Sequence, residues 1–324
     1  MSKLSFVSIV KLLREIDLEG IRKEVERRFA LVIFGEHTQD TIEIGRLLSG
    51  PEIHPWIDLA DTTIPANVTY DLGILVTPHQ KPSQAEKAAM ERLHHQKAPI
   101  IVVETPSPTV MKGIPRRGEF ARVKLRRAND QEGFAEVLAP TILDARDDLL
   151  LAFGRQLDGL RPFVVQRLIE QTATANATYA LSTGLAESVP GLNVPLNVAD
   201  MVVLTKNQLI MAYKIALVYG KEGDPRDLLG EILGVLGGGF FFRQLARQLV
   251  GLIPVAGIPA KTAVAYAGTY VIGEAVRRWA AGEVPMSTEE LRAMFSTLVR
   301  EKRLALRAPD EPLPGDEPLA QHDE

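Results

Sequence analysis

Residues 30–50, ALVIFGEHTQDTIEIGRLLSG, show the pattern of strand, short loop and helix that surrounds a phosphate group in many nucleotide-binding proteins. If Gly35 opened the pattern G-x-x-x-x-G-K-[ST], the required glycine, lysine and hydroxyl would fall on Asp40, Thr41 and Ile42. Asp40 would repel a polyanion, Thr41 lacks the positive charge that neutralises terminal phosphates, and Ile42 cannot bind magnesium. We therefore expect no nucleotide at this loop, while another ligand at the Gly35 loop stays an alternative.

Other catalytic chemistries find little support in the sequence. The chain has no cysteine, which excludes disulfides, thiol catalysis and cysteine metal sites. It contains neither H-E-x-x-H nor G-x-S-x-G, and the adjacent His94 and His95 are typical of a solvated helix face. We predict a protein that is not an enzyme and has no catalytic residues, cofactor or metal. The enzymatic alternative is nucleotide binding or hydrolysis at an unconventional site that uses Asp61 and Glu104.

The elements that must position these residues begin with an α/β part. FALVIFG, YDLGILVTP and APIIVVETP are apolar strand candidates, and helices are expected at 41–48 and 83–96 between them. This alternation predicts an α/β domain with a mostly parallel sheet at 29–144. The segment ARVKLRR alternates like an exposed or edge strand, and Pro140 is expected to kink or start a helix.

Long apolar helical patterns divided by Pro and Gly follow the α/β part and predict an all-α domain at 145–305. The expected helices cover 145–187, 195–220, 224–247, 259–282 and 287–305.

Both ends of the chain are expected to differ from these domains. At the N-terminus, residues 1–28 predict two short amphipathic helices, the second capped by Asp17. At the C-terminus, residues 306–324 are acidic and rich in proline and predict a disordered tail.

Composition and charge are those of a globular protein, with 46% hydrophobic and 24% charged residues and a net charge of −4. The run of cations from Lys112 to Arg127 lacks interleaved aromatic residues for base stacking, so we predict no nucleic-acid partner. The N-terminal residues lack the features of a signal peptide. We expect a cytoplasmic protein, with the inner face of the cell membrane as an alternative place.

The α/β part resembles a Ras-type GTPase domain that has lost its nucleotide-binding motifs. In this comparison FALVIFG is the first strand, DTTIP stands in place of D-x-x-G, and APIIVVETP is the strand before N-K-x-D. Asp61 keeps the acid of D-x-x-G, but Ile64 occupies its glycine position. Residues 104–107, Glu-Thr-Pro-Ser, replace the guanine-reading motif. The resemblance implies a degenerate P-loop GTPase-like fold without guanine recognition.

The helical part resembles the YcjF-type domain of unknown function that follows many bacterial GTPase domains. The resemblance rests on the patterns LTKNQ, RQLARQL, IPVAGIPAK and TYVIGEA within residues 195–283. It implies a helical module that is membrane-associated or coupled to a GTPase, and it supplies no catalytic residues.

An apolar stretch at 248–273 contains Lys261 as its one ionisable residue. It is long enough to cross a bilayer, but three Pro and Gly residues interrupt it, which favours a hairpin or re-entrant segment. Small residues are spaced for close helix packing, at Gly230, Gly234 and Gly238 and at Ala265, Thr269 and Gly273. Membrane contact through 228–273 and burial in a protein core both stay open. The candidate membrane or partner contacts are Phe240, Phe241, Phe242, Arg243, Arg247 and Lys261.

These observations predict a pseudo-GTPase domain that binds a protein partner, joined to a helical module that associates with membrane or with itself. An active GTPase is a candidate partner, and a homo-oligomer is a candidate assembly. A soluble oligomeric structural protein is a further alternative.

Overall fold

The computed structural model describes residues 16–108, 111–112, 120–187, 198–235 and 257–305. The chain divides into two compact units, Met1–Leu168 with Ile210–Glu231, and Ile169–Leu209 with Ile232–Glu324. This division falls inside two long helices, α8 (Arg161–Glu187) and α9 (Val198–Val218), so each unit contains a part of both.

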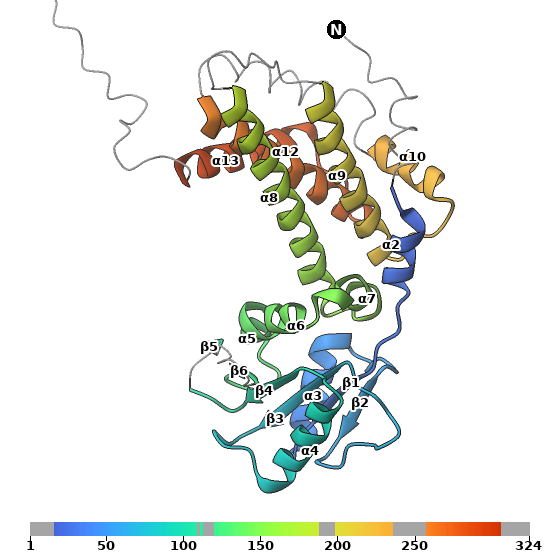
Figure 1. Ribbon diagram of the computed structural model, residues 1–324, viewed down its shortest axis with the longest axis vertical. Helices are drawn as coiled ribbons and strands as arrows, with labels where there is room; N and C mark the ends of the chain where they lie inside the picture. Colours follow the sequence, from blue (N-terminus) through green and yellow to red (C-terminus); the bar gives the residue numbers. More distant parts are fainter. Residues whose placement is uncertain (1–15, 109–110, 113–119, 188–197, 236–256, 306–324) are drawn as a thin grey trace, which may run out of the picture. The chain divides into compact units, whose positions relative to one another are not determined.

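Six strands form one sheet in the first unit, in the order β2-β1-β3-β4-β6-β5 (Figure 1). The neighbours from β2 to β6 are all parallel, whereas β5 runs antiparallel to β6. The mostly parallel sheet predicted from the sequence is therefore confirmed. In chain order the strands are β1 (Leu31–Phe34), β2 (Ile57–Ala60), β3 (Leu72–Thr77), β4 (Ile100–Glu104), β5 (Met111–Lys112) and β6 (Ala121–Lys124).

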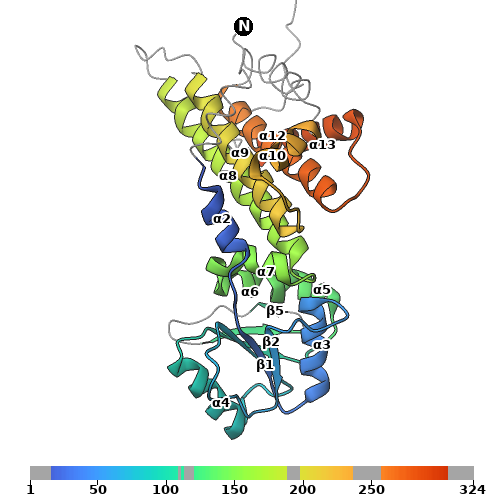
Figure 2. The ribbon, with the colours of Figure 1, turned by 90° about the vertical axis from the view of Figure 1, so that its right-hand side faces the viewer.

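Helices α3 (Thr38–Ser49) and α4 (Gln84–His95) cover opposite faces of this sheet (Figure 2). Strands β1 and β3 are fully buried, and β4 is buried except at Glu104. Strands covered on both faces are apolar at every position rather than alternating, which explains why these three strands were predictable as apolar runs. Met90 and Leu93 of α4 pack against one face, with Leu75 and Val102 of the strands.

Two strands were missed by the sequence prediction, and a third was misplaced. Both β2 and β5 are short, and in β2 only Ile57 is buried. The segment ARVKLRR contains β6, in which Arg122 is exposed and Val123 is buried, but β6 is not an edge strand because β5 pairs with its outer side.

Short helical segments surround the sheet in the first unit. Helix α2 (Leu18–Val25) is capped by Asp17, whose carboxylate accepts a hydrogen bond from the Gly20 amide at 2.8 Å, as predicted. Pro140 lies in the first turn of α6, so its prediction as a helix start is confirmed. Between β6 and α8 the chain forms α5 (Gln131–Gly133), a π-helix (Phe134–Leu138), α6 (Ala139–Ala145), a 3-10 helix (Asp147–Leu149) and α7 (Leu150–Gln156).

The continuous helix predicted at 145–187 is wrong, because the chain turns between α7 and α8. Gly159 lies in this turn, and its amide donates to the Leu48 carbonyl at 2.9 Å. A Cβ on Gly159 would lie 1.9 Å from the Leu47 carbonyl oxygen, so the turn requires glycine. The apolar pattern alone does not show this backbone contact with α3.

Residues from distant parts of the sequence close the first unit. Arg22 of α2 donates to the buried Tyr213 hydroxyl of α9 at 2.8 Å. Phe29 and Phe153 pack edge to face with ring centroids 4.9 Å apart. The α9 segment from 210 onward is therefore part of the same compact unit as the sheet.

The second unit is helical, as the sequence predicted, and contains α12 (Gly257–Ala280) and α13 (Thr288–Ala305) besides its parts of α8 and α9. Ala267 and Val271 of α12 pack with Phe295 and Val299 of α13. The described part of α10 is Pro225–Val235. The predicted helix at 9–16, residues 236–247 of the helix predicted at 224–247 and the predicted tail at 306–324 lie outside the described residues, apart from Ile16.

Candidate functional site

The connection after β1 is the place where the GTPase-like interpretation of the sequence would put a phosphate-binding loop, and it is short. Only Gly35, Glu36 and His37 lie between Phe34 of β1 and Thr38 of α3. The positions that align with the phosphate-binding glycine, lysine and hydroxyl, 40 to 42, all lie inside α3. Three residues extend about 10 Å at most, so the connection cannot wrap around a phosphate as an eight-residue loop does.

Gly35 serves the packing of the strands. A Cβ on Gly35 would lie 2.1 Å from the carbonyl oxygen of Val76 in β3. Its amide donates to the Asp61 carbonyl at 3.3 Å, just after β2. Gly35 therefore allows close approach of β1 to β3 and joins the end of β1 to the end of β2.

The first turn of α3 satisfies several of its own polar groups. The amides of Asp40 and Thr41 donate to the His37 carbonyl at 3.0 and 3.3 Å. The buried Thr41 hydroxyl donates to the Thr38 carbonyl at 2.8 Å. The Asp40 carboxylate supplies, within the chain, the negative charge that a helix N-terminus favours.

Asp61 and Glu104, the two acids of the enzymatic alternative, follow β2 and end β4. Three strand spacings separate these strands, which is about 14 Å across the sheet. Asp61 accepts a hydrogen bond from the Thr63 amide at 2.5 Å, and Glu104 forms an ion pair with Lys124 at 3.2 Å. The structure therefore does not bring the two carboxylates together at one reacting group.

A buried carboxylate that sequence reasoning missed lies at the start of α4. The fully buried Glu86 accepts hydrogen bonds from the Ser83 amide at 2.8 Å and from the Thr77 hydroxyl at 3.3 Å. Ser83 returns a bond by accepting from the Glu86 amide, which completes a capping box. The pattern Ser-x-x-Glu before the helix could have revealed this contact, which joins α4 to the end of β3.

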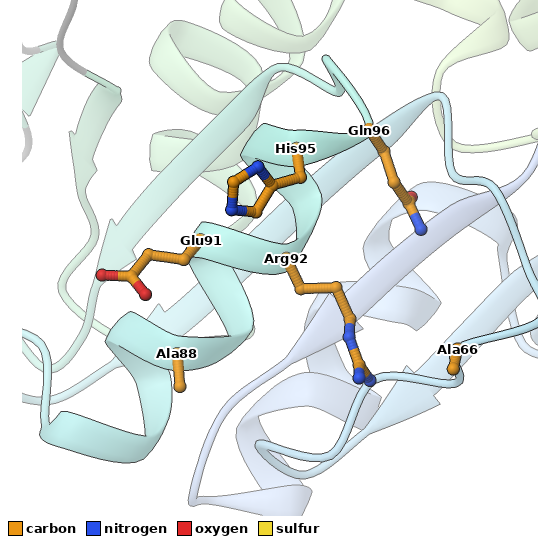
Figure 3. Close-up of a pocket in the computed structure, with 6 residues that line it drawn as sticks. All are labelled: Ala66, Ala88, Glu91, Arg92, His95 and Gln96. Carbon is orange, nitrogen blue, oxygen red and sulfur yellow. The ribbon is translucent and has the colours of Figure 1, made fainter.

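A hollow of about 470 Å³ lies between α4 and the loop at 61–70 (Figure 3). Arg92 holds this loop by donating to the Ile64 carbonyl. Gln96 donates to the Val68 carbonyl at 2.9 Å and accepts from the Tyr70 amide at 3.0 Å. The residues that line the hollow are Ala66, Ala88, Glu91, Arg92, His95 and Gln96.

The hollow has mixed charge and small apolar side chains, which suits contact with a protein surface. His95 lines it, and both His94 and His95 are exposed, as predicted for a solvated face. Across the described ranges, no group of three or more His, Cys, Asp or Glu side chains is arranged to hold a metal ion. Sequence patterns gave no signal for this hollow because it depends on how the loop is held against α4.

The cations near β6 are engaged within the unit. Arg126 forms an ion pair with Glu132 at 2.7 Å, Lys124 pairs with Glu104, and Arg122 donates to the Gln80 carbonyl at 3.0 Å. Residues 113–119, which carry further cations of the predicted basic run, lie outside the described residues.

The predicted contact residues of the helical part are not placed by the structure. Phe240, Phe241, Phe242, Arg243 and Arg247 lie outside the described residues. Lys261 belongs to α12, but its side chain is not among those described. Among the helices of the described ranges, none is both long and apolar enough to span a bilayer.

The second unit contains a cluster of four polar side chains, hereafter the amide cluster, formed by Asn176, Asn207, Gln208 and Thr269. Asn176 is fully buried and donates to the Thr269 hydroxyl oxygen at 2.9 Å. Asn207 donates to the Asn176 side-chain oxygen at 2.8 Å, and Gln208 donates to Thr269 at 3.1 Å. The cluster therefore joins α8, α9 and α12. Its residues Asn207 and Gln208 belong to the LTKNQ pattern, and Thr269 belongs to the TYVIGEA pattern.

The close helix packing predicted at small residues is present in helix α12. A Cβ on Gly273 of α12 would lie 2.6 Å from the Ile169 side chain, so glycine is needed there. A Cβ on Gly230 or Gly234 would meet no described atom within 4 Å, so the described residues give no partner for the packing predicted at these two positions. Gly238 lies outside them.

Neither the protein-family models nor the curated proteins match this chain.

Proposed function

We propose that this chain is a non-enzymatic adaptor. Its α/β unit binds a protein partner, and its helical part associates with a membrane or with further copies. The observation that carries the proposal is the three-residue connection between β1 and α3. Open α/β sheets usually bind their ligands beyond the carboxyl ends of the strands, and here the groups at that place are used by the chain itself.

The resemblance to a degenerate Ras-type domain followed by a YcjF-type domain supports the same proposal. In that comparison the α/β unit is a GTPase fold without nucleotide chemistry, and an active GTPase is the candidate partner. The mixed-charge hollow beside α4, with a volume of about 470 Å³, offers such a partner a shaped surface.

The first experiment tests nucleotide chemistry in the full chain. We expect no magnesium-dependent turnover of GTP or ATP. Turnover that disappears in Asp61→Ala would overturn the proposal in favour of the enzymatic alternative. The double variant Asp40→Gly/Thr41→Lys should also fail to bind GTP tightly, because the connection stays too short. Micromolar affinity in a titration of that variant would contradict the argument.

The second experiment tests the helical part by flotation of the full chain with vesicles that contain anionic lipid, at low and high salt. Membrane association through the apolar segment predicts flotation that survives high salt and is lost in Phe240→Ser/Phe241→Ser/Phe242→Ser. The matched variant Arg243→Glu/Arg247→Glu removes only an electrostatic contribution, so it should lower flotation mainly at low salt.

Self-association is the second candidate for the helical part, because its sequence is apolar enough for either role. A single oligomer in light scattering without detergent, combined with no flotation, would favour it. A monodisperse monomer that does not float would remove both roles and leave the helices as a protein core.

A further inference from the structure

Strand β2 is an open edge of the sheet (Figure 1). It pairs with β1 on one side, and within the described residues no strand pairs with its other side. The Leu31 amide donates to the Trp56 carbonyl at 3.0 Å, and this bond determines which residues of β2 direct their backbone amide and carbonyl groups toward β1. Asp58 and Ala60 therefore bond toward β1, while the amide and carbonyl of Leu59 point away from it.

The Leu59 side chain adds an apolar surface to this edge. It is 37% exposed, which is high for a large hydrophobic side chain. Gly45 of α3 lies beside it, because a Cβ there would lie 3.5 Å from Leu59 and 3.1 Å from Ile53. The partly exposed Ile53 and the 37% exposed Leu59, packed over the buried Gly45, form a small apolar shelf next to the backbone groups of Leu59 that point away from β1. Such a shelf fits one apolar side chain of an added strand.

The electrostatic surroundings of β2 are acidic. From Leu47 to Gln80 the chain contains no Lys or Arg, and its acids are Glu52, Asp58, Asp61 and Asp71, of which Asp71 forms an ion pair with Arg146 at 3.1 Å. Glu52 and Asp61 are exposed on either side of β2. Asp58 accepts its hydrogen bond from the neutral Tyr70 hydroxyl, at 2.6 Å, so this contact brings no positive charge. The preceding cation, Arg46, is already paired with Glu43 at 3.2 Å.

We propose that β2 takes up an extended, positively charged segment of a protein partner as an additional strand. This inference rests on the proposed function and names the surface and the chemistry of the partner. The added strand bonds to Leu59 through its backbone, places an apolar side chain on the shelf, and sets its cations against the acids that flank β2. A second copy of this chain would bring the same acidic edge and is disfavoured by repulsion.

The probe for this proposal is an acetylated heptapeptide in which lysine and valine alternate, with a glutamate and valine peptide as the charge-reversed control. The readout is hydrogen exchange of single amides in the full chain. At a lysine peptide concentration about ten times its Kd, exchange of the Leu59 amide should slow about tenfold. The glutamate peptide should leave it unchanged.

Leu59→Pro removes the outward amide without removing a bond to β1, and proline is tolerated on the free side of an edge strand. Binding of the lysine peptide, followed by its fluorescence anisotropy, should be lost, while exchange of the Leu31 amide shows that the ladder to β1 persists. Leu59→Lys keeps the amide and should weaken binding by like-charge repulsion. The equally exposed Leu181→Lys on α8 should not weaken it.

Equal binding of both peptides, or binding that survives both Leu59 variants, would overturn the proposal. A dimer in light scattering that Leu59→Pro converts to monomer would assign the edge to a second copy and overturn it as well. These outcomes differ from a failure of the proposed function, which would show as nucleotide turnover. If a protein partner protects only the hollow at α4, the proposed function survives and the β2 inference fails.

Discussion

The connection after β1 and the amide cluster both place small or polar residues inside apolar surroundings. In the connection, Gly35 is needed because the β3 backbone leaves no room for a side chain. In the amide cluster, Asn176 is needed because its amide bonds with two other helices. The available volume requires glycine at position 35, and hydrogen bonding requires asparagine at position 176. Residue types that suggest catalysis or binding in the sequence therefore serve strand packing in the first unit and helix register in the second.

The largest expected effect tests the volume requirement. Gly35→Ala should lower the free energy of unfolding by about 3 kcal/mol or more, because its Cβ would meet a strand carbonyl that cannot move freely. Urea unfolding monitored by circular dichroism measures this. The same substitution at Gly230 in α10, where a Cβ would meet no atom of the described residues within 4 Å, should instead stabilise by up to about 1 kcal/mol. Similar changes in the free energy of unfolding for Gly35→Ala and Gly230→Ala would show that lack of space is not what requires glycine at position 35.

The amide cluster provides the next effect. Asn176→Ala should cost about 2–3 kcal/mol, because it removes a fully buried side chain together with the acceptor of the Asn207 amide and one donor to the buried Thr269 hydroxyl. Chemical unfolding tests this value, with Thr178→Ala on the exposed side of α8 as the control that should change stability by less than about 0.5 kcal/mol. A double-mutant cycle with Thr269→Val should show coupling above about 0.5 kcal/mol. Simple additivity would mean that the cluster does not act as a unit.

A smaller effect is expected at the capping box of α4. Ser83→Ala removes the side-chain acceptor of the Glu86 amide and should cost about 1 kcal/mol. Hydrogen exchange should show the loss as faster exchange in the first turn of α4, with the amides of β3 unaffected. Faster exchange throughout the first unit would instead show that the contact between Ser83 and the buried Glu86 stabilises the whole unit.

The smallest effect concerns a surface ion pair and its pH dependence. The hydrogen bond from Arg146 lowers the pKa of Asp148 below its ordinary value. A lowered folded-state pKa contributes stability above about pH 4 and loses it as the pH falls through that pKa. Since Asp148 is half exposed, Asp148→Asn should cost no more than about 1 kcal/mol at pH 7. The gap between wild type and variant should close toward pH 2 in urea unfolding, and a gap that widens would reverse the assignment.

Local sequence patterns predict much of the fold, and the elements that they miss share a cause. The apolar strands β1, β3 and β4 and the cap at Asp17 were predictable because burial and capping leave local patterns. Strand β2 was missed because it has four residues, of which only Ile57 is buried, so it leaves no apolar run and no clear alternation. The turn at Gly159 was missed because its requirement comes from the α3 backbone.

The candidate site shows the same limit. The lack of lysine and glycine in the Gly35 region was visible in the sequence, but the length of the connection was not, because the start of α3 at Thr38 decides it. The hollow beside α4 and the amide cluster depend on residues far apart in the chain. The residues expected to contact membrane, from Phe240 to Arg247, stay a prediction.

The discontinuity of the first unit has a consequence for biosynthesis. A ribosome delivers the sheet strands first, but Tyr213, which receives the bond from Arg22, emerges only after most of α8 and α9. At about 5–20 residues per second, the interval between residues 168 and 231 lasts about 3 to 13 s. During this time α2 and α7 lack the contacts that residues 210–231 supply, so a chaperone that holds apolar surface should act on this chain mainly while α8 and α9 are being translated.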